Sequence, residues 1–407
     1  MRFVLGLACA LALLTAFSTP TPSVAYEVFA TSIFSPVDPD PDPGLTGLLK
    51  IDTDTGVATT LVAESVGGLT SPTDVVFASD TNTVYVSTQN GYIWHYDATT
   101  GAPHDSLVVG QPTGVFALLP TAGFMDGVNS LLLDDDELLA ATAFGAITPF
   151  DLATGAQQAD LATGLVFPSG LSKTPGGAIL ASTGNPLGEI PTPGTIVQVA
   201  NGMVTTLVDE MASPGVFPAS NPTVVTPAAD YDGDGVVTTA DYDTWEALYA
   251  SGNPLADGNR DGAVDAADYT LWRDSLGEEA RILVTDLFTN QVVGFDLDGS
   301  AGAHFALIPP FPLPPEVDPT NSPSELLVSP EGTLLVSTLG PTRRPDNRGA
   351  LHEFDRNGNH LRTIVDGLPA LSGIALAPAA APAVIPEPST LLLASAAALF
   401  LGGRFRR

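Results

Sequence analysis

One short phrase occurs twice in the middle of the chain, and it limits what that region can fold into. Residues 230–241 read DYDGDGVVTTAD, and residues 257–268 read DGNRDGAVDAAD. The copies start 27 residues apart (257 − 230). The same offset relates Tyr242 to Tyr269 and Trp245 to Trp272, so the repeat extends beyond the phrase itself. A phrase repeated in register predicts two copies of one local structure.

Each copy has the spacing of a calcium loop of the EF-hand type. Oxygen-bearing side chains occupy positions 1, 3, 5, 9 and 12, and glycine occupies position 6, where the loop turns sharply. Calcium is a hard cation that takes six to eight oxygen ligands, and alternate residues of a tight loop can point at one centre. Position 12 is Asp in both copies instead of the longer, bidentate Glu. The predicted ligands of two Ca²⁺ ions are Asp230, Asp232, Asp234, Thr238, Asp241 and the carbonyl of Val236, and then Asp257, Asn259, Asp261, Asp265, Asp268 and the carbonyl of Ala263.

The paired loops resemble type I dockerin, in which each loop ends in Asp and runs straight into a helix. The stretch ADYTLWRDSLG at residues 267–277 is similar to dockerin repeats of large secreted proteins from planctomycete-type bacteria. The resemblance covers about 50 residues, and it implies two bound Ca²⁺ ions and docking to a cohesin-like protein. The alternative is a pair of acidic turns that bind nothing.

The charge of the chain argues against nucleic acid as a partner. Fourteen Lys and Arg stand against 46 Asp and Glu in 407 residues, for a net charge of −32. Such a surface repels phosphate backbones. Outside the calcium loops, we interpret the acidic excess as a contribution to solubility.

The sequence predicts a targeting signal at each end of the chain. Residues 1–25 have a basic Arg2, an apolar run and the small-x-small sequence SVA, which predicts a secretory signal peptide. The only cysteine, Cys9, lies within it, so the mature chain is expected to have no disulfide. Residues 384–407 contain a Pro-Glu-Pro motif, an apolar stretch and a basic tail, and they resemble the PEP-CTERM sorting signal. That resemblance implies processing by an exosortase, delivery to the cell surface or outside it, and only transient contact with the membrane.

The rest of the chain repeats at a longer period. Runs of strand composition such as VYVST (84–88) and LLVST (334–338) are each followed by a second run that closes on Asp or Asn and Gly. The interval between the runs at residues 179 and 282 is about twice as long as the others, and removing about 50 residues of dockerin brings it into line. The pattern predicts a mainly β, six-bladed propeller of four-stranded sheets with a small α dockerin inserted in a blade hairpin. Residues 373–376 are expected to complete the first blade.

This rhythm of strands and turns resembles NHL-repeat and gluconolactonase-like propellers. Metal-dependent members of the lactonase group place Glu, Asn and Asp around the central channel, but that set cannot be assigned from this sequence. Asp74, Asn129, Asn221 and Glu325 lie near the starts of predicted inner strands and could line one mouth of the channel. Turn caps or a solvated rim are the simpler interpretation of such residues.

No catalytic constellation is apparent. The five histidines are scattered over different units, and the chain has no HxxxH pair, nucleophile elbow or phosphate loop. The predicted organisation is a signal peptide (1–25), a first part of the propeller (26–227), a dockerin-like insertion (228–278), a second part (279–380) that closes on the first blade, and the sorting signal (384–407).

The sequence leaves two main functions open, and a third in which the calcium loops only stabilise the fold and no cohesin partner exists. The first is an exported, surface-sorted propeller protein whose calcium-binding module docks to a cohesin-like partner, in a polysaccharide-degrading context. The alternative is a secreted lactonase-like or glycan-active hydrolase carried by the propeller.

Overall fold

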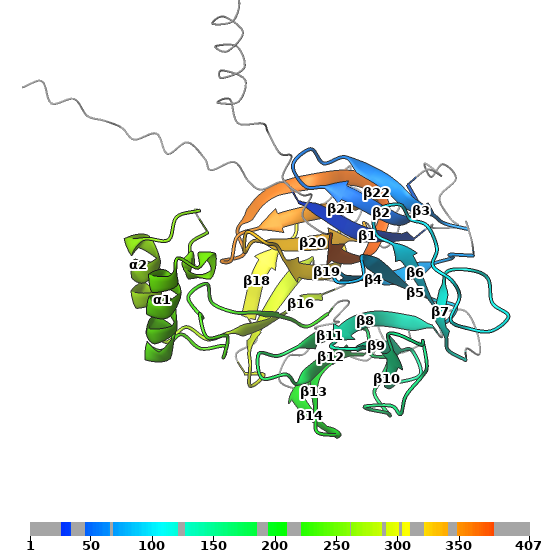
Figure 1. Ribbon diagram of the computed structural model, residues 1–407, viewed down its shortest axis with the longest axis horizontal. Coiled ribbons are helices and arrows are strands. Elements are labelled where there is room, and N and C mark those ends of the chain that lie inside the picture. The colour runs from blue at the N-terminus through cyan, green and yellow to red at the C-terminus, as the bar shows by residue number, and fades with distance from the viewer. Residues whose placement is uncertain are drawn as a thin grey trace, which may run out of the picture.

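The computed structural model describes residues 26–33, 45–65, 68–120, 127–184, 194–209, 221–260, 262–286, 290–300, 303–309, 321–340 and 348–377. The predicted signal peptide (1–25) and sorting signal (384–407) lie outside these residues. Within them the fold is mainly β and has the arrangement of a propeller, with the helices set to one side (Figure 1). The mainly β fold class expected from the strand-like runs is therefore confirmed.

The strands of the described residues form five hydrogen-bonded sheets. Three of these sheets have four strands, one has three, and one has seven. The first four-stranded sheet contains β4 (Pro72–Ala78), β5 (Thr83–Thr88), β6 (Tyr92–Asp97) and β7 (Val115–Leu118). The second contains β11 (Gly170–Lys173), β12 (Ile179–Thr183), β13 (Thr195–Ala200) and β14 (Met203–Val208). The third contains β15 (Thr223–Val225), β16 (Arg281–Asp286), β17 (Gln291–Asp296) and β18 (Ala303–Leu307). The three-stranded sheet contains β8 (Val128–Asp134), β9 (Glu137–Thr142) and β10 (Ala146–Asp151). The seven-stranded sheet runs in the order β19 (Pro323–Val328), β20 (Leu334–Thr338), β21 (Arg348–Phe354), β22 (His360–Leu376), β1 (Glu27–Ile33), β2 (Gly47–Asp52), β3 (Ala58–Ala63).

The prediction of six separate four-stranded blades is wrong for the described residues. The long strand β22 is the main reason, because its first part pairs with β21 and its last part pairs with β1. Val28 lies opposite Leu376 and Ala30 opposite Ile374, so the two ends of the described chain share one sheet. Among the described residues, the sheet β8–β10 has three strands, and the isolated bridges Ile147–Ala162 and Phe150–Gln157 lie along its outer edge.

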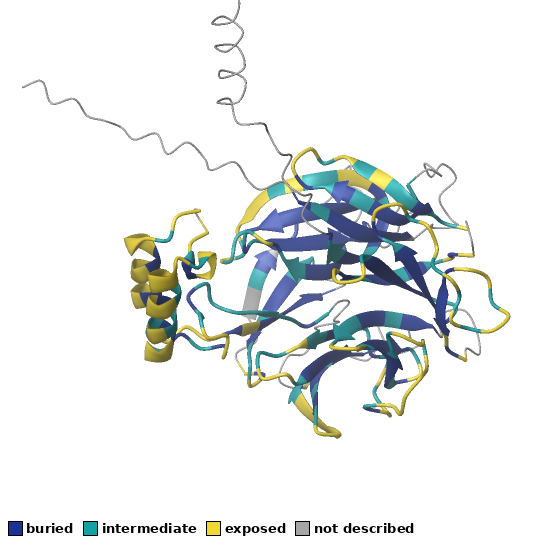
Figure 2. Cartoon of the chain, viewed as in Figure 1, coloured by how far each residue is buried: buried dark blue, intermediate teal, exposed yellow. Residues whose placement is uncertain are grey.

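Most of the core lies between neighbouring sheets, and one cluster lies between the two halves of the seven-stranded sheet. Phe29 and Leu48 of the seven-stranded sheet pack with Val84 and Trp94 of the sheet β4–β7. The same alternation of buried side chains continues from sheet to sheet around the molecule. Sheets that bury apolar faces against two neighbours form a ring, as in a propeller. Figure 2 shows the sheets largely buried and the helices largely exposed.

The closing turns behave as their sequences predict. Asp97 accepts hydrogen bonds from the backbone and hydroxyl of Thr100, and Gly101 follows at φ 69°. Asp151 and Thr154 repeat this arrangement. The hydrogen bonds from Thr100 hold the pKa of Asp97 below its usual value. This turn chemistry is local, which explains why it can be predicted without knowledge of the fold.

The helical segment lies between two paired strands of one sheet. It contains α1 (Thr239–Ser251), the short 3-10 helix η1 (Pro254–Ala256) and α2 (Ala266–Asp274). On either side of it in sequence, Val225 of β15 lies opposite Arg281 of β16. The two ends of the segment are also tied together, because Val237 N–H donates to Glu278 O at 2.9 Å and Ala280 N–H donates to Gly235 O at 2.7 Å. The segment therefore leaves and re-enters its sheet at one place.

Replacing residues 228–279 with Asp-Gly is expected to leave the sheets folded. The strands β15 and β16 already pair, and shortening a surface loop changes its closure entropy little, by about 0.6 kcal/mol per twofold change in length. Thermal unfolding followed by circular dichroism should show one cooperative transition for the β signal, near that of the full chain. A shortened chain that fails to fold, or that melts as two independent halves, would contradict insertion within one sheet.

A search of the described helices for one long and apolar enough to cross a membrane finds none.

Candidate calcium loops

The two predicted loops lie at the N-terminal ends of the two helices. Residues 230–241 run into α1, and residues 257–268 run into α2. Each helix begins with a capping box: Thr238 and Asp241 exchange side-chain and backbone hydrogen bonds at α1, and Asp265 and Asp268 do so at α2. The capping box satisfies amides that a helix start leaves without partners. The start of each helix therefore fixes the side chains at loop positions 9 and 12, which are Thr238 and Asp241 in the first loop and Asp265 and Asp268 in the second.

The first loop brings three carboxylates together. One oxygen from each of Asp230, Asp232 and Asp234 lies within 4.8 Å of the others. The loop bends around them, because Asp230 accepts from Gly233 N–H at 2.9 Å and from Gly235 N–H at 3.0 Å. Gly235 has φ 95°, a conformation that side-chain-bearing residues rarely adopt. Three hard anionic oxygens at one point are the donor set that Ca²⁺ prefers.

Asp241 is fully buried and closes the first loop. Its carboxylate accepts from Tyr231 N–H at 2.7 Å, from Asp232 N–H at 3.1 Å and from Thr238 N–H at 2.7 Å. The structure thus places this position-12 residue against the backbone of the loop that holds the three clustered carboxylates. The Val236 backbone forms an isolated bridge with Glu279, so this position is anchored to the segment that returns to the sheet.

The second loop repeats these contacts. Asp268 is also fully buried, and it accepts from Asn259 N–H at 3.2 Å and from Asp265 N–H at 2.8 Å. Asp257 accepts from Gly262 N–H at 2.8 Å, as Asp230 accepts from Gly235. The predicted ligand Asp261 lies outside the described residues, so its place relative to Asp257, Asn259 and Ala263 is not described. The hydrogen bonds to Asp257 and Asp268 thus repeat those to Asp230 and Asp241.

In the first loop, burial and neighbouring carboxylates make the ionised form of Asp230 less favourable. Burial raises the pKa of Asp230, the hydrogen bonds from Gly235 and Gly233 oppose that rise, and the neighbouring Asp241 and Asp234 add to it. Burial also raises the pKa of Tyr231 to about 12, with the carboxylates of both loops contributing. A divalent cation at the cluster would reverse this balance, because an opposite charge favours the ionised carboxylate. The residues present therefore fit a calcium ion in both charge and donor type.

The helices pack on each other through an aromatic cluster. The ring of Tyr242 lies 5.0 Å from that of Trp272 and 6.0 Å from that of Tyr269, measured between centroids. The Trp272 indole N–H donates to Thr238 O at 2.7 Å, which ties α2 to the end of the first loop. The buried apolar residues of this unit are few: Ala229, Val237 and Trp272 form its main cluster. So small a core contributes little stability on its own.

Three of the four channel candidates come together, and one does not. Asp74 accepts from Leu131 N–H at 2.8 Å, and Asn221 accepts from Ser130 Oγ and Leu171 N–H, both at 2.8 Å. Glu325 is buried, interacts with Asn221 and is close enough to Asp74 for the charges to repel. Asn129 instead donates to Pro168 O at 2.9 Å. The first three form a polar cluster that caps inner-strand amides, with Asp74 and Glu325 buried and Asn221 half-buried.

Burial dominates the titration of this polar cluster. It raises the pKa of Asp74 to about 6, although the amides of Leu131 and Val75 oppose the rise. Burial also raises the pKa of Glu325 well above its usual value, and the charge of Asp74 adds to the effect. For two of the scattered histidines, burial lowers the pKa instead of raising it. The pKa values of His95 on β6 and His352 on β21 are lowered to about 4.

The fold and these loops define the class of protein: a β-propeller with an inserted pair of acidic loop–helix units. No family model matches the sequence, and no curated protein matches it. The solved structures that match the chain include a nidogen/laminin complex, at 11% identity and a TM-score of 0.49, covering 88% of this chain and 100% of that one. The calcium-binding protein regucalcin from Agrobacterium tumefaciens str. C58 is 15% identical with a TM-score of 0.43, covering 79% and 86% of the two chains. Streptogramin B lyase is 12% identical with a TM-score of 0.40, covering 71% and 67%. These similarities therefore do not assign a function to this chain.

Proposed function

We propose that this chain is an exported, surface-sorted propeller protein that binds Ca²⁺ through its helical segment and uses that segment to dock to another protein. The observation that carries the proposal is the clustering of the Asp230, Asp232 and Asp234 carboxylates in a loop whose hydrogen bonds recur in a second loop. We assign two Ca²⁺ ions, one to each loop. The repeated Asp-ended loops support a dockerin module, and a dockerin implies a cohesin-like partner.

Folding and docking are coupled in this proposal. The helical unit has a small core and a dense set of carboxylates, which repel one another when no cation is present. Metal binding to such a segment supplies free energy for its folding. A partner that recognises the folded pair of helices would therefore bind only the calcium-loaded form.

The two terminal motifs support an exported location. The signal peptide and the PEP-CTERM-like segment are the basis for assigning the protein to the cell surface or the extracellular space, after exosortase processing. Both lie outside the described residues, so this part of the proposal rests on sequence alone. The dockerin resemblance is the basis for a polysaccharide-degrading context.

A secreted lactonase-like or glycan-active hydrolase is the second candidate. The buried pair Asp74 and Glu325 favours it, because carboxyl groups with strongly perturbed pKa values in one cluster are a common feature of catalytic sites. Their hydrogen bonds to strand amides equally fit a purely structural role. We favour the docking function because the two calcium loops explain more of the unusual sequence of this chain than the pair Asp74 and Glu325 does.

A pull-down from the extracellular fraction of the source organism tests the docking function. Calcium-loaded chain is expected to capture a cohesin-like protein that is released by chelation, because the docking surface exists only when the helices are folded. The same chain should show no turnover against a panel of lactones and glycans. A partner that stays bound after chelation, or the absence of any partner, would contradict docking, and turnover abolished by Asp74→Asn would favour the hydrolase.

A further inference from the structure

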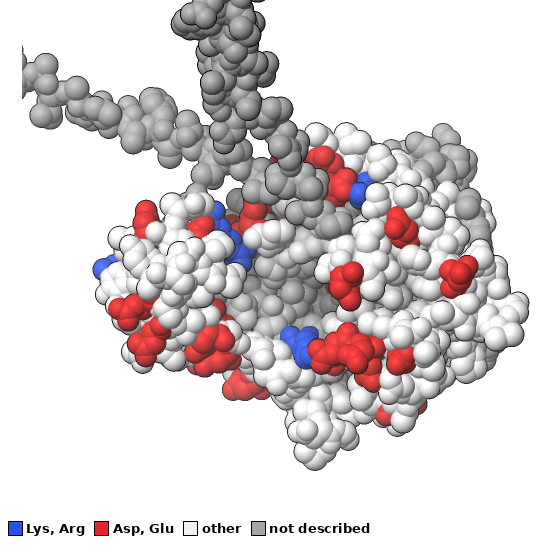
Figure 3. Space-filling view, viewed as in Figure 1, with Lys and Arg blue, Asp and Glu red and all other residues white. Residues whose placement is uncertain are grey.

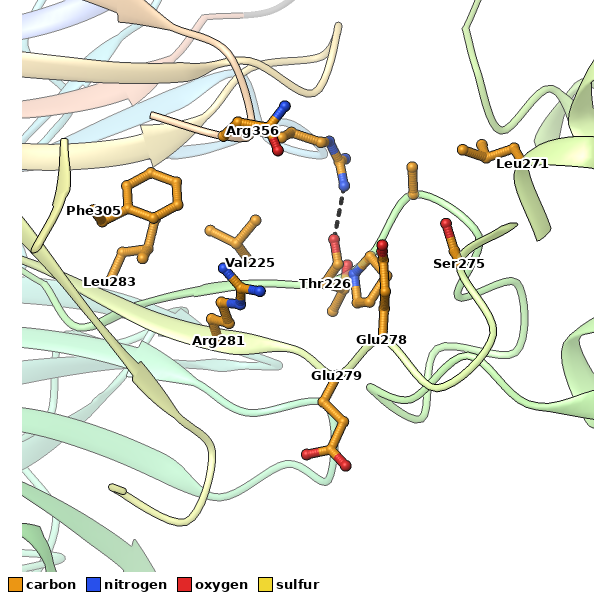
Figure 4. A pocket seen from close by; sticks show the side chains of 13 residues that line it. Val225, Thr226, Leu271, Ser275, Glu278, Glu279, Arg281, Leu283, Phe305 and Arg356 are labelled. Atoms are coloured by element: carbon orange, nitrogen blue, oxygen red, sulfur yellow. Dashed lines mark hydrogen bonds between the residues drawn. The ribbon is translucent and has the colours of Figure 1, made fainter. Parts of the chain in front are cut away.

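A cleft lies where the helical segment meets the sheets, and neither the calcium loops nor the polar cluster accounts for it. Its volume is about 290 Å³. One wall comes from the end of α2 and the return segment, through Leu271, Ser275 and Glu278. The other wall comes from the sheets and the connection into α1 (Figure 4). The cleft is near the lower end of the size range of small-molecule sites.

Among the described Lys and Arg side chains, those without an ion pair lie in or beside the cleft. Arg281 and Arg356 line it, and Arg260 lies close enough to Arg356 to lower its pKa further, after the effect of burial. Every other Lys or Arg side chain that the structure describes is ion-paired. These pairs are Lys50–Glu27, Lys173–Asp134, Arg273–Asp274 and Arg362–Glu353.

This concentration is unusual in a chain with a net charge of −32. Figure 3 shows Lys and Arg side chains between the helical segment and the sheets, close to acidic groups, and also elsewhere on this face. Arginines that form no ion pair in a concave site attract an anion there. Glu278 and Glu279 also line the cleft, so the two arginines point to a singly charged anion that carries neutral polar groups.

The two lining arginines differ in how firmly they are held. Arg356 is half-buried, and it donates to Gly332 O at 3.0 Å and to Thr226 O at 2.8 Å, which fixes the plane of its guanidinium while leaving other N–H groups unused. Arg281 is exposed, and no side-chain partner holds it among the described residues. Figure 4 shows its guanidinium on the same side of the cleft as Val225 and Thr226. A planar guanidinium is suited to bidentate recognition of a carboxylate.

The other lining groups narrow the class of anion. Val225, Leu283 and Phe305 present an apolar wall that suits the C–H face of a ring. Glu278 is close enough to Arg356 to raise its pKa, against the lowering by burial and Arg260. A carboxylate at that position accepts hydrogen bonds from hydroxyl groups and repels a doubly charged phosphate more than a singly charged carboxylate. The lining therefore combines sites for a carboxylate, for hydroxyls and for an apolar ring face.

We propose that this cleft binds a sugar acid, with Arg281 and Arg356 holding its carboxylate, Glu278 accepting from its hydroxyls, and Val225, Leu283 and Phe305 contacting one face of its ring. The site is independent of the proposed docking function. It joins residues of the helical segment to residues of the sheets, so the ligand would bridge the two parts.

Ligand-observed NMR on the full chain in calcium tests the site, with galacturonate as the probe and galactose as the matched ligand that lacks the carboxylate. Galacturonate is expected to bind and galactose to bind at least about tenfold more weakly, since the charge-assisted hydrogen bonds are lost. Added salt should weaken galacturonate binding, because Arg281 is exposed. Acetate and inorganic phosphate are titrated in parallel.

Arg281→Gln should weaken galacturonate binding by about tenfold or more without lowering the melting temperature, because the substituted side chain is exposed and the backbone pairing of β16 is unchanged. Arg273→Gln is the matched control, since Arg273 lies on α2 and pairs with Asp274 outside the cleft. Four results would overturn the proposal: no galacturonate binding, equal binding of galactose, acetate or phosphate binding as tightly as galacturonate, or an Arg281→Gln variant that binds like the parent chain.

Discussion

Removing calcium with a chelator is expected to unfold residues 229–280 and to leave the sheets folded. The helical unit buries only a small apolar cluster, and the carboxylates of Asp230, Asp232 and Asp234 repel one another when no cation lies between them. Amide hydrogen exchange should show loss of protection in α1 and α2 and little change in the strands. Fluorescence gives a second readout, because Trp245 and Trp272 lie in the helices whereas Trp94 lies in the sheet core.

Single substitutions separate the two calcium sites. Asp230→Ala removes a ligand of the first loop and also the acceptor for Gly235 N–H, so calorimetry should show one site where the parent chain shows two. Asp257→Ala should do the same for the second loop. Asp243→Ala is the matched control, since Asp243 is exposed on α1 and lies outside the loop. Calorimetry that detects no heat of calcium binding, or exchange that is unchanged by chelation, would contradict the calcium assignment.

Raising the pH is expected to destabilise the propeller through its buried carboxyl groups. The pKa of Asp74 in the folded state is about 6, compared with an ordinary value of 3.8, so the folded state favours the protonated form. The stabilisation that this provides is complete below the ordinary value, and it is lost progressively as the pH rises from about 4 to about 6. A shift of this size corresponds to about 3 kcal/mol in the free energy of unfolding. Glu325 changes in the same direction.

The measurement is the difference in unfolding free energy between the parent chain and Asp74→Asn, taken from pH 4 to pH 7.5. Asn cannot ionise, so the difference should move in favour of the variant by about 3 kcal/mol as the pH rises, whatever its offset at pH 4. Asp136→Asn is the matched control for loss of a carboxyl group, because Asp136 is exposed at the turn between β8 and β9. A constant difference for Asp74→Asn would show that the pKa of this carboxyl group is not raised in the folded chain.

Interactions between near neighbours in sequence could be read from the chain alone. The turn at Asp97 and Thr100, the capping box at Thr238 and Asp241, and the bend around Asp230 all join residues within about a dozen positions of one another. Such contacts depend on side-chain chemistry and glycine placement, so their sequence pattern is sufficient to predict them. The mainly β composition of the fold follows in the same way from recurring strand-like runs.

The channel candidates mark the limit of that approach. Asp74, Asn129, Asn221 and Glu325 share a position near the starts of predicted inner strands, and the sequence offers no means of choosing among them. The structure unites Asp74, Asn221 and Glu325 and directs Asn129 to Pro168 O. The difference depends on which strand lies next in space, and that information is distributed over the whole ring of sheets.

The sequence by itself determined the short-range features of this protein: the two acidic loops, the helices that follow them, the Asp and Gly turns and the strand-like runs, because each depends on residues that are close together in the chain. Only the tertiary structure decided how the strands divide into sheets, since β22 pairs with β21 at one end and with β1 at the other. Only the tertiary structure brought Arg260, Arg281 and Arg356 to one place as well. Both outcomes follow from the closure of the ring, which joins distant segments by burying apolar faces between neighbouring sheets and leaves no local signal in the sequence.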